Sequence, residues 1–155
     1  AARKLGGILK DRVQKAMSDG APASAASTCA GVAQEITADV ARVTGVAVGR
    51  ASVRLRNPKN APPAWVDAWL RHHEGAPAAE VSLDRWIVDT PEGAVARVIL
   101  PIAVEPLCVT CHGPLEGIDA GVREVLAARY PGDAATGYAV GDLRGALWAE
   151  RAVEP

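Results

Sequence analysis

The pentapeptide Cys108-Val109-Thr110-Cys111-His112 constrains this chain of 155 residues more than any other segment. It has the C-x-x-C-H form of a c-type haem attachment motif. Two thiols separated by two residues can add to the two vinyl groups on one edge of a porphyrin, and the following histidine is then held beneath the iron. The fold must therefore house one covalently attached haem (heme c), bound by Cys108 and Cys111, with His112 as a ligand of the metal.

Other interpretations of closely spaced cysteines are weaker. A thioredoxin-like redox pair would place Cys108 at a helix N-terminus inside a parallel βαβ unit, and the sequence shows no such pattern. A zinc site could add Cys29 to the two thiols and the histidine of the motif, but adjacent Cys111 and His112 would struggle to reach one tetrahedral ion together. A chance match is disfavoured because Cys and His occur only three times each.

The composition favours the same interpretation. Hydrophobic residues make up 49% of the chain, yet it has no Phe and only four Trp and two Tyr. A core built mainly from Val, Leu, Ile and Ala lacks large flat apolar surfaces, and a porphyrin could supply one. The length suits a single domain, residues 1–155.

Charge and hydropathy exclude two classes of partner. The formal net charge is −1, with acidic and basic residues interspersed, so nucleic acid is not an expected partner. No apolar run reaches the roughly 18–20 residues of a membrane span. Because haem is attached to a c-type apoprotein after export, we expect a periplasmic or other exported location.

The hydrophobic periodicity predicts an α+β fold with a central antiparallel sheet of about five strands, N-terminal helices and a haem loop. The first helix has a narrow apolar stripe near heptad spacing, so residues 1–20 are expected to project and to pair in a homodimer. The predicted helices are Leu5–Gly20, Ser24–Thr44, a short helix that starts near Pro63, and Ala120–Arg129. The predicted strands are Val46–Arg56, Glu80–Asp89, Ala94–Val104 and Leu143–Val153.

Four side chains could bind the iron opposite His112. Met17 lies on the apolar stripe of the first helix and is expected to fill the core. His72 and His73 fall in a polar helix end, where an exposed imidazolium is favourable. Cys29 lies in mid-helix among alanines that would let a macrocycle come close. The residues alone leave two roles open for Cys29, iron ligand or small buried hydrophobe.

Arg50, Arg54 and Arg56 alternate along the predicted strand Val46–Arg56 and would share one of its faces. Guanidinium groups fit carboxylates, so these residues could bind the haem propionates. A solvated strand face would show the same pattern, and the sequence does not separate the two.

Three segments, GRASVRLRNPKNAPPAW, LCVTCHG and YPGDAATGYAVGDLRGAL, occur in an order that resembles a family of single-haem c-type proteins. That family was long labelled a domain of unknown function; it has a PAS-like fold and forms stand-alone exported cytochromes or extracytoplasmic sensor modules. The resemblance spans Ser24 to Ala152 and implies that Cys29 is the second iron ligand. An acid tends to follow the Trp of the first segment, whereas Val66 follows Trp65 here, so no role is carried over for that acid.

The resemblance and the thiolate chemistry imply a function. A thiolate favours Fe(III), so a His/Cys haem should have a low midpoint potential. We expect a sensor of redox state or of a diatomic gas, or a low-potential electron-transfer protein, working with a redox or signalling partner. A haem enzyme that acts on small sulfur compounds is the alternative, although such enzymes normally use a second haem and the chain has one C-x-x-C-H motif.

Overall fold

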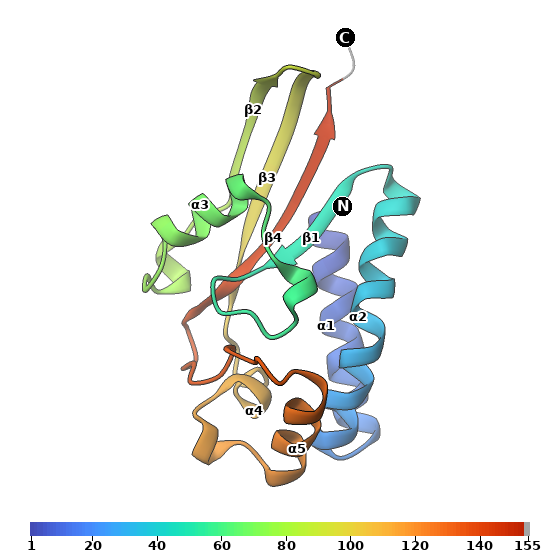
Figure 1. Cartoon of the computed structure of the whole chain (residues 1–155), viewed down its shortest axis with the longest axis vertical. Coiled ribbons are helices and arrows are strands. Elements are labelled where there is room, and N and C mark those ends of the chain that lie inside the picture. The colour runs from blue at the N-terminus through green and yellow to red at the C-terminus, as the bar shows by residue number, and fades with distance from the viewer. Residues whose placement is uncertain (154–155) are drawn as a thin grey trace.

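A computed structural model of the chain describes residues 1–153, apart from the side chains of residues 28 and 29. Figure 1 shows five helices, four strands and short connecting turns. The helices are α1 (Ala2–Asp19), α2 (Pro22–Thr44), α3 (Ala64–His72), α4 (Val109–His112) and α5 (Ala120–Arg129). The strands are β1 (Ala47–Ala51), β2 (Asp84–Thr90), β3 (Gly93–Ala103) and β4 (Leu143–Ala152), and three 3-10 turns are η1 (Pro58–Asn60), η2 (Ala78–Glu80) and η3 (Leu115–Gly117).

The strands form one antiparallel sheet in the order β1-β4-β3-β2. The α+β class with a central antiparallel sheet is thereby confirmed, with four strands in place of about five. Every strand pair in the described part of the chain is antiparallel, so the parallel βαβ unit of a thioredoxin-like protein is not found there.

Two strand boundaries differ from the sequence prediction. The first strand ends at Ala51 and does not reach Arg56, because the Ser52 hydroxyl accepts a hydrogen bond from the backbone N–H of Arg54 (3.2 Å) and turns the chain. Arg54 and Arg56 therefore do not share a strand face with Arg50. The second strand begins at Asp84 rather than Glu80, and Glu80 is instead the last residue of the 3-10 turn η2.

The helices end close to the predicted positions. Gly45 closes α2 in the left-handed conformation (φ 64°), where glycine carries no steric penalty. The side chain of Asp119 accepts hydrogen bonds from the first backbone N–H groups of α5. The helix α1, expected to project, lies along α2 and over the sheet, with Ala2 and Leu5 buried.

The sheet separates two hydrophobic layers. Alternate residues point to opposite faces, so Ala149 packs with Leu5 and Val48 beneath α1 and α2, whereas Trp148 packs with α3. In Figure 1 the α1–α2 pair covers one side of the sheet, α3 covers the other, and α4 and α5 lie beyond one end of it. None of the described helices is both long and apolar enough to cross a membrane.

Candidate functional site

The predicted attachment motif forms the short helix α4. Cys108 is its N-cap residue, and the backbone N–H of His112 donates to the carbonyl oxygen of Cys108 at 2.9 Å. Side chains four residues apart lie on the same side of a helical turn, so Cys108 and His112 face the same way. Gly113 ends the turn, and a Cβ atom there would meet the carbonyl oxygen of Val109 at 2.6 Å.

Cys108 and His112 line a half-open cavity of about 440 Å³, which we call the motif cavity. Its size falls in the range of pockets that hold small molecules and cofactors. The walls come from α1, the sheet, the motif and the segments on either side of them. Apolar lining residues include Leu9, Val13, Leu55, Ile102, Leu107 and Leu147, and basic ones are Lys10, Arg50, Arg56 and Arg144.

The second motif cysteine, Cys111, is absent from the described lining of this cavity. It packs against an apolar cluster formed by Ala26 of α2 with Ile118, Val122 and Leu126, and Tyr130 packs against the same cluster. Tyr130 in turn lines the motif cavity. The sequence-predicted ligand Cys29 follows Ala26 by one turn of α2, and its side chain lies outside the described residues.

His112 is held as a neutral imidazole. Its Nδ1 lies 2.7 Å from the carbonyl oxygen of Ala135. A carbonyl oxygen only accepts, so Nδ1 carries the proton and the Nε2 lone pair is available to a metal. Burial, followed by the positive charges of Arg144 and Arg56, lowers the pKa of His112 to about 3. Such a backbone partner for the second ring nitrogen is typical of histidines that bind metals.

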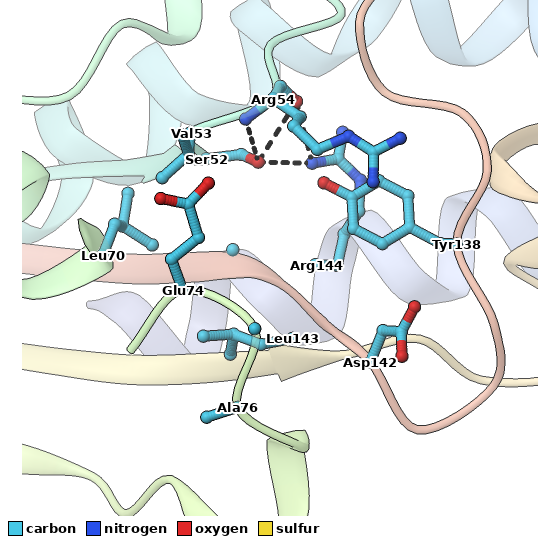
Figure 2. Close-up of a pocket in the computed structure, with 12 residues that line it drawn as sticks. Ser52, Val53, Arg54, Leu70, Glu74, Ala76, Tyr138, Asp142, Leu143 and Arg144 are labelled. Atoms are coloured by element: carbon cyan, nitrogen blue, oxygen red, sulfur yellow. Dashed lines mark hydrogen bonds between the residues drawn. The ribbon is translucent and has the colours of Figure 1, made fainter. Parts of the chain in front are cut away.

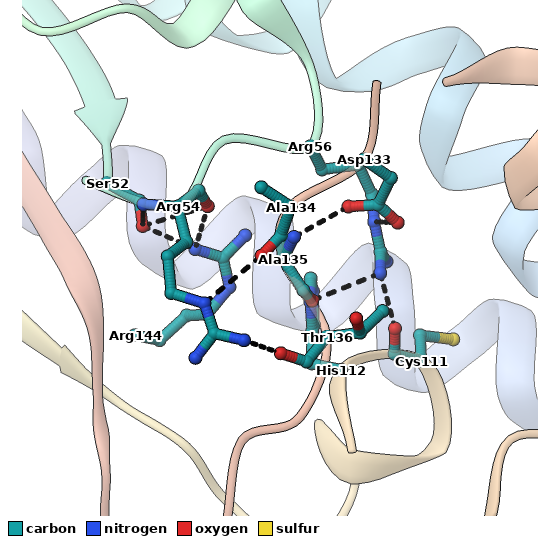
Figure 3. Close-up of polar contacts among 10 residues, drawn as sticks. All are labelled: Ser52, Arg54, Arg56, Cys111, His112, Asp133, Ala134, Ala135, Thr136 and Arg144. Atoms are coloured by element: carbon teal, nitrogen blue, oxygen red, sulfur yellow. Dashed lines mark hydrogen bonds and ion pairs between the residues drawn. The ribbon is translucent and has the colours of Figure 1, made fainter. Parts of the chain in front are cut away.

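The three predicted arginines take different positions, and Figure 3 shows two of them, Arg54 and Arg56. Arg56 pairs with Asp133 (Nε to Oδ2, 2.9 Å) and donates to the carbonyl oxygen of Cys111, so it joins the motif to residues 133–135. Arg54 donates to the carbonyl oxygens of Ala134 and Thr136 instead. Arg50 and Arg56 line the motif cavity, and Arg54 is absent from its described lining.

The sequence prediction missed Arg144. This side chain lines the motif cavity, and its Nη1 donates to the hydroxyl of Ser52 at 2.8 Å. Burial is the main cause that lowers its pKa. The segment YPGDAATGYAVGDLRGAL, quoted for the family resemblance, contains Arg144 as its one basic residue, and that was the available signal.

The remaining candidate iron ligands lie elsewhere. His72 and His73 belong to the end of α3, on the sheet face opposite α1, and the Nδ1 of His73 lies 2.9 Å from the carbonyl oxygen of Trp69. Met17 is half-buried in α1 and is absent from the described lining of the motif cavity. No group of three or more His, Cys, Asp or Glu among the described side chains could hold a metal ion.

Fold and site together define an α+β protein that presents a neutral histidine and a thiol to one apolar, arginine-bordered cavity. The chain belongs to the Tll0287-like family, whose sequence model it matches over residues 5–149. The match includes most of α1 as well as the three segments that carried the resemblance.

A solved structure has a similar fold. The crystal structure of the cyanobacterial haem protein Tll0287 superposes with a TM-score of 0.61, at 24% sequence identity, over 79% of this chain and 70% of that chain. No curated protein matches the sequence.

Proposed function

We propose that this protein carries one haem in the motif cavity, attached through Cys108 and Cys111, with His112 as an iron ligand. The observation that carries the proposal is the state of His112: a neutral ring, its Nδ1–H fixed by Ala135, beside a cavity that Cys108 also lines. The Tll0287 structure is of a haem protein, and this chain shares its family and fold.

The walls of the motif cavity suit such a group. A haem has a flat apolar face and two carboxylates, and the cavity offers aliphatic side chains together with cationic ones. Guanidinium groups form paired hydrogen bonds with carboxylates. Arg50 and Arg56 are the predicted arginines that line the cavity, and we propose them as the partners of the propionates. Arg54 would act indirectly, by fixing residues 134–136 behind His112.

We further propose that Cys29 would be a second ligand of the haem iron. The support is the position of its helix: Ala26, one turn earlier, belongs to the apolar cluster against which Cys111 packs. The alanines Ala25, Ala26 and Ala33 are all buried, so the backbone of α2 approaches its neighbours closely on that face. A thiolate from this helix would reach the motif from the side of α2.

When bound, haem supplies one-electron redox chemistry at its iron. An anionic thiolate ligand favours the ferric state and gives a low potential. We propose electron transfer, or sensing of redox state or of a diatomic gas, in an exported compartment and with a redox or signalling protein as partner. The enzyme alternative has no support of its own in the geometry.

Covalent attachment is tested by mass. Protein made in a host with cytochrome c maturation should exceed the mass of the bare chain by one haem and give a c-type pyridine spectrum. The paired substitution Cys108→Ser and Cys111→Ser should return the unmodified mass. Wild-type protein that emerges colourless and unmodified from such a host would refute the proposal.

The axial pair is tested by spectroscopy of the ferric protein. Cys29→Ser should remove the low-spin thiolate EPR signal and raise the midpoint potential, while haem stays attached because the motif is intact. His73→Ala is the matched control, since α3 lies on the other face of the sheet, and it should leave the spectrum unchanged. If Cys29→Ser matches wild type and His73→Ala does not, the thiolate assignment is wrong.

A further inference from the structure

A second cavity, of about 280 Å³, lies on the other side of Arg144 and is shown in Figure 2. We call it the Tyr138 cavity. Its wall combines cationic, anionic and aliphatic side chains: Arg54 and Arg144; Glu74 and Asp142; and Val53, Leu70, Ala76 and Leu143. Neither the motif cysteines nor His112 line it.

Tyr138 supplies a hydroxyl to this cavity. The residue as a whole is 5% exposed, but its hydroxyl is not among the described buried atoms that lack a hydrogen-bond partner, so it is reached from the open cavity. A tyrosine hydroxyl can donate a hydrogen bond to a carboxylate. In Figure 2 the ring projects from residues 136–140 and directs its hydroxyl into the cavity, toward the side from which the Glu74 carboxylate points.

Two cations lie at the same end. The guanidinium carbon of Arg54 is 4.3 Å from the centre of the Tyr138 ring, and that of Arg144 is 5.2 Å from it. Neither cation forms an ion pair with a described residue. Arg144 hydrogen-bonds through Nη1, which leaves Nε and Nη2 without a described acceptor. This end of the cavity therefore offers donors and positive charge to a carboxylate.

The opposite charge comes from α3. Glu74 follows the C-terminal end of that helix, and its carboxylate has no ion-pair partner among the described residues. It lines the cavity with the aliphatic side chains Leu70 and Ala76 close by in the chain. An ammonium group beside Glu74 and a carboxylate beside Arg144 would each meet a complementary charge, and Leu70 and Leu143 offer an apolar wall to a side chain on the same carbon.

We propose that the Tyr138 cavity binds a small aliphatic α-amino acid. Its carboxylate accepts from Tyr138 and Arg144, its ammonium donates to Glu74, and its side chain contacts Leu70 and Leu143. The site is separate from the proposed haem site, although Ser52 and Arg144 line both cavities.

Isothermal titration calorimetry on the haem-loaded protein tests this proposal with three matched probes. L-valine carries both charged groups, isovalerate lacks the ammonium, and isobutylamine lacks the carboxylate. L-valine should bind with one-to-one stoichiometry, and each of the other two should bind at least about tenfold more weakly, because a charge on the protein is left unmatched. Equal binding of L-valine and isovalerate, or no heat with L-valine at millimolar concentration, would overturn the proposal.

Two variants locate the site. Glu74→Gln should weaken L-valine about tenfold or more and leave isovalerate unchanged, whereas Tyr138→Phe should weaken both. Glu92→Gln, in the β2–β3 turn, is the control and should bind as wild type. Wild-type affinity for L-valine in Glu74→Gln would contradict the model of the site. A visible spectrum of each sample reports the haem independently, so absence of haem and absence of amino-acid binding are distinguishable outcomes.

Discussion

The two faces of the sheet pack against different types of side chain. All four tryptophans, Trp65, Trp69, Trp86 and Trp148, pack together on the face that α3 covers. Trp65 makes edge-on contacts with Trp86 (ring centres 5.6 Å apart) and with Trp148 (5.9 Å). In the apolar cluster on the other face, the described residues of α1 and α2 are aliphatic or alanine, and the motif cavity opens there.

The difference explains how a chain without phenylalanine forms a core. On one face indole rings fill the space, and the indole N–H of Trp69 donates a hydrogen bond to the carboxylate of Asp84 at 2.6 Å. The described apolar cluster on the other face contains no aromatic residue, and the cavity beside it is lined mainly by leucine, valine and arginine side chains. In our proposal a flat prosthetic group takes the place of the missing aromatic residues. We call the face under α1 and α2 the helix-covered face and the face under α3 the tryptophan face. Haem should then stabilise the helix-covered face and have little influence on the tryptophan face.

The largest effect is expected on the tryptophan face. Trp69→Ala should lower the free energy of unfolding by about 3–5 kcal/mol, because it removes a buried aromatic ring and leaves Asp84 without its donor. Urea denaturation should give the same loss in wild type and in the Cys108→Ser, Cys111→Ser background.

Leu147→Ala is the counterpart on the helix-covered face. Leu147 lines the motif cavity, so its truncation should cost about 2 kcal/mol or more with haem attached. The loss should be smaller in the background without attachment, with a coupling of about 1 kcal/mol. Equal losses for Leu147→Ala in both backgrounds would show that haem does not contact this face.

Alanine substitution of one glycine on each face compares the two faces with smaller expected losses of stability. A Cβ at Gly49 would lie 2.7 Å from ring atoms of Trp148, and one at Gly6 would lie 2.6 Å from Cδ1 of Leu147. Gly49→Ala should cost about 1–3 kcal/mol, because a packed indole cannot move aside. Gly6→Ala should cost less than about 1 kcal/mol, because a leucine end beside a cavity can rotate and alanine favours the helix.

Thermal or urea unfolding of both variants checks this order. Haem content serves as the control, since Gly6 borders the motif cavity and Gly49 does not. A Gly6→Ala variant that is less stable than Gly49→Ala would mean that the helix-covered face is the more tightly packed of the two.

Much of this architecture could be predicted from local patterns. The helix periodicity, the Gly45 stop and the Ala120–Arg129 helix depend on nearby residues, and these elements agree with the structure. The end of β1 does not depend on local sequence alone. Ser52 turns the chain there, and its hydroxyl is held by Arg144, a residue 92 positions away.

In the candidate site, too, some features depend on local sequence and others on tertiary contacts. The motif is contiguous, so Cys108, Cys111 and His112 could be recognised from their spacing. The partner that orients His112 is a backbone carbonyl, that of Ala135, and no side-chain pattern reveals it. The arginines required tertiary contacts, because Arg54 and Arg56 leave the predicted strand face once the chain turns.

The strand order has a consequence for how the protein matures. The central strand β4 pairs with both β1 and β3. Because β1 precedes the motif in the chain and β4 follows it, strand residues far apart in sequence pair, such as Ala47 with Glu150. Pairing between such distant segments is slow compared with helix formation. The sheet therefore closes only after segments on both sides of the motif have paired. Until then the thiols of Cys108 and Cys111 lie in an open chain, which in our proposal is the form that a haem-attaching enzyme would reach.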